Sequence, residues 1–158
     1  MREKTKTSQE AMAELRFDLL TRRITPSDAA LRTNLHLTTI YHQCDRLSNS
    51  CGFKIPWPWY FRRRGGCRKS NLKEYEKSGR QLISVIETLG LSTNVSDIVK
   101  DTGLGRPTVC KILYCLPLFG INTTIRRSGR GVPQEVIIKP IDLDKIYVIH
   151  RSLKEILS

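Results

Sequence analysis

Apolar residues recur at steps of three and four in three stretches of the chain, a spacing that predicts helices with one buried face. The stretches cover residues 8–21, 79–89 and 142–157. Thr7 with Glu10 is expected to form a capping box for the first helix, and Ser78 is expected to cap the second. The apolar stripes consist of Ala11, Met12, Leu15, Leu19 and Leu20; of Leu82, Ile83, Ile86 and Leu89; and of Ile146, Ile149, Leu153 and Ile156.

Two further stretches, residues 26–47 and 95–116, are similar to each other. They align without gaps at an offset of 69, and six of the 22 positions are identical. Such self-similarity indicates a repeated structural unit. The identical pairs are Ser27/Ser96, Asp28/Asp97, Thr33/Thr102, Leu35/Leu104, Thr39/Thr108 and Leu47/Leu116.

The second copy has the pattern of two helices joined by a tight turn. Gly103 suits the left-handed conformation that ends a helix, and Leu104 is expected to bury in the junction. Pro107 is tolerated in the first turn of the following helix. The expected inward face of that helix consists of Val109, Ile112, Leu113 and Leu116. This order is typical of a helix-turn-helix unit.

The first copy repeats the pattern with different residues. Thr25 is expected to be an N-cap, Pro26 the first helical residue, and Asp28 the partner in a capping box. Asn34 replaces Gly103, and asparagine also tolerates a left-handed turn. The junction residue is Leu35, and the inward face of the second helix is weaker than in the other copy: Ile40, Cys44 and Leu47, with Gln43 where the second copy has Ile112.

The segments behind the two units differ. Residues 121–127 and 132–138 are rich in β-branched side chains and flank the turn 128–131, which predicts a β-hairpin, or wing. After the first unit, Pro56 and Pro58 exclude a regular central strand, so that segment is either a distorted wing or an arm. The predicted fold is mainly α with small β-wings, in two tandem helix-turn-helix (winged-helix-like) domains. Their boundaries are 1–52 for the first domain, 53–78 for a basic, aromatic wing or linker, 79–140 for the second domain and 141–158 for a C-terminal helix.

Residues 80–138 resemble the winged-helix domain of the IclR and MarR kinds of prokaryotic transcription regulator. The motif VSDIVKDTGLGRPTVCKIL at residues 95–113, with the hairpin behind it, carries the resemblance. Residues 8–69 resemble a helix-turn-helix domain more loosely. The resemblance implies a winged-helix DNA-binding protein.

The charge agrees with a polyanionic partner. The chain carries 27 Lys+Arg against 15 Asp+Glu, a formal net charge of +12. Basic residues gather at Arg62, Arg63 and Arg64 and again at Arg126, Arg127 and Arg130. Apolar runs are too short for a membrane span and no secretory signal precedes them, so we expect a cytoplasmic protein of the nucleoid.

The second helix of each unit is expected to enter the major groove, where base pairs differ in their donors and acceptors. Arg106 is the best candidate base reader, because its fork can bond guanine O6 and N7 together. The basic loops are expected to contact phosphates, which give affinity without sequence information. The aromatic residues before the first cluster are expected to pack rather than stack on bases: Trp57, Trp59, Tyr60 and Phe61. The candidate DNA-binding residues are Arg106, Thr108, Lys111 and Tyr114 in the second unit, His36, Thr38, Thr39, Tyr41 and His42 in the first, and Arg62, Arg63, Arg64, Arg126, Arg127 and Arg130 in the loops. Asp45 is a further outward residue, which could read cytosine N4.

Catalysis is not indicated. The five cysteines, Cys44, Cys51, Cys67, Cys110 and Cys115, contain no C-x-x-C pair, so we expect free thiols and no metal site. Histidines and acids form no convincing catalytic group, which predicts a non-enzyme without a cofactor.

The sequence therefore favours a transcriptional regulator that binds specific double-stranded DNA. The alternatives are a plasmid or phage replication or segregation protein, the DNA-binding arm of a transposase, and a protein–protein adaptor. The C-terminal helix either makes a homodimer or folds back onto its own domain.

Overall fold

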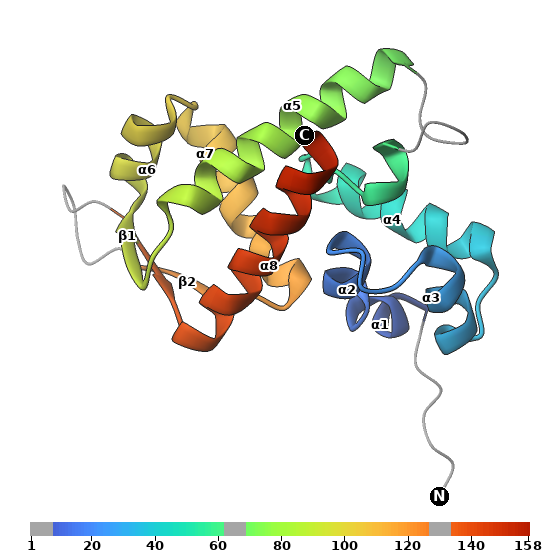
Figure 1. Ribbon diagram of the computed structural model, residues 1–158. Helices are drawn as coiled ribbons and strands as arrows, with labels where there is room; N and C mark the ends of the chain where they lie inside the picture. The colour runs from blue at the N-terminus through green and yellow to red at the C-terminus, as the bar shows by residue number, and fades with distance from the viewer. Residues whose placement is uncertain (1–7, 62–68, 127–133) are drawn as a thin grey trace, which may run out of the picture.

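The computed structural model describes residues 8–61, 69–126 and 134–158, in which helices predominate over one small sheet (Figure 1). The first half contains α1 (Ser8–Ala13), α2 (Arg16–Leu20), α3 (Pro26–Thr33), α4 (Leu37–Cys51) and the 3-10 turn η1 (Pro58–Phe61). The second half contains α5 (Lys69–Thr88), β1 (Ser92–Asn94), α6 (Val95–Thr102), α7 (Arg106–Cys115), the 3-10 turn η2 (Leu116–Phe119), β2 (Thr123–Arg126), β3 (Glu135–Ile138) and α8 (Pro140–Leu157).

The prediction of one helix over residues 8–21 is wrong, because the chain turns between α1 and α2. The Leu15 N–H bonds to the Met12 carbonyl, three residues back, which tightens the backbone at the break. Met12, Leu19 and Leu20 are nevertheless buried, as the apolar stripe predicted.

The two helix-turn-helix patterns are confirmed at their turns. The Thr25 hydroxyl accepts from the Asp28 N–H at 3.1 Å, and the Asp28 carboxylate accepts from the Thr25 N–H at 3.0 Å, which completes the capping box. Asn34 and Gly103 both end their helices in the left-handed region, with φ of 56° and 69°. Pro107 lies in the first turn of α7.

The helix predicted to start at Gly79 is α5, which begins at Lys69 instead. Ser78 is therefore no cap: it lies inside the helix, and its hydroxyl donates to the Tyr75 carbonyl at 3.0 Å. The additional turns are polar, and a search for apolar stripes does not detect a helix of that kind.

The predicted hairpin is confirmed and belongs to a three-stranded antiparallel sheet of order β1-β3-β2. Thr123 pairs with Ile138 and Arg126 with Glu135, while β1 lies on the other side of β3. The sequence did not predict β1, because it has only three residues and no apolar side chain. The predicted turn at 128–131 lies outside the described residues.

The apolar stripe of α8 faces its own chain. Ile146, Ile149 and Leu153 are buried, and α8 packs along α5, which Figure 1 shows as two neighbouring helices. Of the two alternatives for this helix, folding back accounts for the stripe.

Residues 53–61 contain no strand and connect the halves as a buried segment. Trp57 is fully buried, stacks on Trp59 at 5.2 Å and meets Phe119 edge-on at 5.9 Å. The predicted packing role is confirmed for Trp57, Trp59 and Tyr60.

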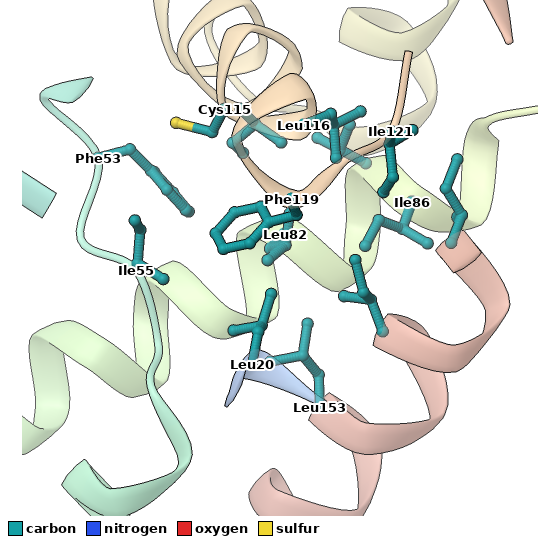
Figure 2. Close-up of a cluster of buried hydrophobic side chains, with 14 of the residues drawn as sticks. Leu20, Phe53, Ile55, Leu82, Ile86, Cys115, Leu116, Phe119, Ile121 and Leu153 are labelled. Carbon is teal, nitrogen blue, oxygen red and sulfur yellow. The ribbon is translucent and has the colours of Figure 1, made fainter. Parts of the chain in front are cut away.

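The buried residues of both halves form one cluster. Figure 2 shows Leu20, Phe53 and Ile55 of the first half facing residues of the second half. Those residues are Leu82, Ile86, Cys115, Leu116, Phe119, Ile121 and Leu153. Among the described residues, no helix is both long and apolar enough to cross a membrane.

Candidate nucleic-acid interface

Helix α7 is held by its inner face and leaves a polar face exposed. Val109, Ile112 and Leu113 are fully buried, so the helix cannot rotate without opening the core. Arg106, Lys111 and Tyr114 are exposed, as predicted. These three residues form what we call the α7 face.

Arg106 is tethered at the start of the helix. Its guanidinium donates to the Ser96 hydroxyl of α6 at 3.1 Å. A guanidinium has five N–H donors, so this bond leaves donors for another partner. The contact restricts the side chain near the point where α6 and α7 begin.

Thr108 does not share the α7 face. It is half-buried and, with Lys111, lines a hollow of about 270 Å³ between α7, α5 and the end of α4. The hollow is also lined by Gly52, Phe53, Lys54, Glu74, Lys77, Ser78 and Gln81.

Two of these lining residues, Lys54 and Lys77, were not among the candidates predicted from the sequence. Lys54 forms an ion pair with Glu74, and Lys77 follows one helical turn later. They stand beside Lys111 only because the two halves pack together. Alignment of the two copies gives no signal for such a contact.

Helix α4 presents a mixed surface. His36, Thr38 and His42 are exposed as predicted, whereas Thr39 and Tyr41 are half-buried. Tyr41 packs edge-on against Trp59, with ring centroids 5.7 Å apart.

Asp45, the residue considered as a cytosine reader, already has a protein partner. It accepts a hydrogen bond from the Tyr60 hydroxyl. Burial raises the pKa of Tyr60, and the bond to Asp45 raises it further, so the phenol keeps its proton. This bond ties α4 to η1.

The basic loops are described only in part. Arg126 is exposed at the end of β2, opposite Glu135. Arg127 and Arg130, and likewise Arg62, Arg63 and Arg64, lie outside the described residues.

Helices α4 and α7 meet near their C-terminal ends. The Cε of Lys111 is 3.9 Å from the position that a Cβ on Gly52 would occupy, and Cys115 hydrogen-bonds to Cys51. The N-terminal ends of α4 and α7, at His36 and Arg106, are the ends that lie away from this contact.

The described residues contain no group of three or more His, Cys, Asp or Glu that could hold a metal ion. Cys44, at an inward position of α4, is buried, and burial raises the pKa of its thiol to about 12. Its place in the core agrees with the expectation of a small apolar residue there.

A scan against protein-family models, a search of curated proteins and a search of solved structures each found no match to this chain.

Proposed function

We propose that this chain binds specific sequences of double-stranded DNA and regulates transcription by occupying them. The observation that carries the proposal is the α7 face, in which Arg106, Lys111 and Tyr114 stand exposed on a helix fixed by its buried side. A helix of this kind fits the major groove, and arginine discriminates guanine there.

The surrounding elements support the same proposal. From α5 to β3 their order is helix, strand, helix, helix, and a two-stranded hairpin that pairs with the first strand. We interpret this half as a winged helix, with Arg126 in the strand pair of its wing that lies next to the connecting turn. The first half is interpreted as a helix-turn-helix unit whose connection, residues 53–61, has become part of the core.

The joint between α4 and α7 limits the site that the chain can read. At 1.5 Å per residue, α4 is about 22 Å long and α7 about 15 Å. Helices that meet at their C-terminal ends therefore hold their N-terminal ends at most about 40 Å apart. Successive major grooves on one face of DNA are about 34 Å apart, which falls within this upper limit, so half-sites a single turn apart are compatible with one chain.

Selection of bound fragments from a random duplex library, followed by anisotropy titration of the winning site, tests the proposal. We expect two unlike half-sites one turn apart and Kd values that rise steeply with salt. Absence of salt-dependent binding to any duplex would overturn the proposal. Mapping the site to a promoter or to a replication origin separates regulation of transcription from replication.

Variants of the α7 face sharpen the test. Arg106→Ala should weaken the selected site about tenfold or more and change random duplex little, because a base contact is lost. Lys111→Ala should weaken both and lower the salt slope by about one, as for a lost phosphate contact. Arg151→Ala, an exposed arginine on α8, is the matched control and should leave both titrations unchanged.

A further inference from the structure

The pair of cysteines at the joint of the two halves is used by nothing in the proposed function. Cys51 is the last residue of α4, and Cys115 is the last residue of α7. Cys115 is buried and Cys51 half-buried, and both are free thiols. They lie in opposite halves of the sequence, so a bond between them would join the two helix-turn-helix units.

Several contacts bring the two sulfur atoms to the same place. The Cys51 S–H donates to the Phe53 carbonyl oxygen at 3.3 Å. Figure 2 shows the Cys115 sulfur directed toward the segment that carries Phe53. The Cys115 S–H donates to the Cys51 sulfur, so the thiols are in direct contact.

The contact makes the two thiols chemically unequal. The hydrogen bond from Cys115 lowers the pKa of Cys51 to about 6 against the effect of burial, and backbone hydrogen bonds at Phe53 and Cys51 act with it. Donating that bond raises the pKa of Cys115, and burial raises it further. The contact therefore favours ionisation of Cys51 over that of Cys115, the inequality found in pairs in which one cysteine reacts and the other resolves it.

Cys51 is half-buried and lies next to residues that line a hollow of the surface. Gly52 and Phe53, the residues after Cys51, line the hollow of about 270 Å³ that opens between α7 and α5. By contrast, Cys44 is buried, and burial raises its pKa. Among the described thiols, the contact with a second thiol singles out Cys51.

We propose that Cys51 and Cys115 form a reversible disulfide when the protein meets a peroxide, which fastens α4 to α7. The Cys51 thiolate attacks a peroxide oxygen and the O–O bond breaks, which leaves a sulfenic acid on Cys51 and a hydroxide that takes up a proton from the solvent and departs as water. The Cys115 sulfur then attacks the Cys51 sulfur, the S–O bond breaks and the S–S bond forms. The proton of Cys115 leaves with the hydroxide as a second water, so two thiols are oxidised and one peroxide is reduced. This inference does not rest on DNA binding.

The test uses the full chain with Cys67→Ser, treated with hydrogen peroxide near neutral pH and then alkylated. Before alkylation the chain should be about 2 Da lighter, for two lost hydrogens; after alkylation it should carry two fewer alkyl groups than the reduced chain, with one linked pair of peptides containing Cys51 and Cys115. Cys51→Ser and Cys115→Ser should each abolish the link, and dithiothreitol should reverse it. The matched control, Cys110→Ser, removes another half-buried thiol of α7 and should leave the link intact.

Two further measurements separate this reaction from random oxidation. With Cys115→Ser, dimedone should label Cys51, because the sulfenic acid has lost its resolving partner; with Cys51→Ser, position 115 should stay unlabelled. The oxidised chain should melt roughly 5 to 15 °C higher than the reduced chain, because the bond restrains the unfolded state. A loss of two hydrogens that persists with Cys51→Ser, no link at any peroxide concentration, or a lower Tm after oxidation would overturn the proposal.

Discussion

Trp57 is the residue whose replacement tests whether the halves share one core. Its side chain is fully buried, stacks on Trp59 with an angle of 11° between the rings, and meets Phe119 of the second half edge-on. Its indole N–H has no hydrogen-bond partner among the described residues. Trp57→Ala therefore removes contacts to both halves and one buried unpaired donor.

The magnitude follows from these contacts. Truncating a buried tryptophan costs about 3 to 5 kcal/mol, and each aromatic pair accounts for about 1 kcal/mol of that. Removing an unpaired donor returns about 1 kcal/mol, so a net loss of about 3 kcal/mol is expected. For a chain of this size the Tm should fall by roughly 6 to 12 °C. Trp57→Phe keeps a ring without the donor and should lose about 1 kcal/mol.

The assay follows urea unfolding by fluorescence and by far-UV circular dichroism. The chain has two tryptophans, both at the joint, so fluorescence reports the joint while circular dichroism reports all helices. The two curves of the unchanged protein should superimpose. Leu31→Ala, at a side chain that is 82% exposed, is the control and should change stability by less than about 0.5 kcal/mol. A shared core is refuted if fluorescence changes well before circular dichroism, or if Trp57→Ala costs less than about 1 kcal/mol.

Two predictions concern the turns and caps. Gly103→Ala should cost about 1 kcal/mol by urea unfolding, because φ is +69° while a Cβ there meets no atom within 4 Å; Asn34→Gly, at φ of 56°, should stay within about 0.5 kcal/mol. A Gly103→Ala variant as stable as the parent would contradict the left-handed turn. The hydrogen bond from the Thr25 backbone N–H lowers the pKa of Asp28, and the interaction with the Thr25 side chain lowers it further. Because the folded pKa is the lower one, the stability that Asp28 contributes is present above its unfolded pKa and is lost as pH falls through the folded pKa. The Tm difference between the parent and Asp28→Asn should therefore be seen at pH 6 and vanish in stronger acid, and a difference that persists there would contradict the capping box.

Local rules predicted much of the fold from the sequence. Thr25, Asn34, Gly103 and Pro107 act through the backbone of their own turn, so their roles could be identified without knowledge of the rest of the chain. The hairpin was detectable because β-branched residues flank a glycine-containing turn. The polar start of α5 and the short β1 carry no apolar pattern, and the structure alone revealed them.

The candidate site was only partly predictable. Exposure of Arg106, Lys111 and Tyr114 follows from the spacing of the buried residues on α7. The half-buried state of Thr108 and Tyr41, the partner of Asp45, and the presence of Lys54 and Lys77 beside Lys111 all depend on contacts between segments far apart in the chain. The spacing of apolar residues within one helix does not predict contacts of that helix with distant segments.

Helix α5 is a long element that is held by contacts near both of its ends. Near its start, Tyr75 packs on Tyr60 at 4.4 Å and Glu74 pairs with Lys54, while Val85 near its other end is buried in the second half. A helix of 20 residues is a stiff rod about 30 Å long, and tilting it by about 10° would displace one end by roughly 5 Å. Because the helix is held near both ends, we expect a displacement of η1 to move the second half with it.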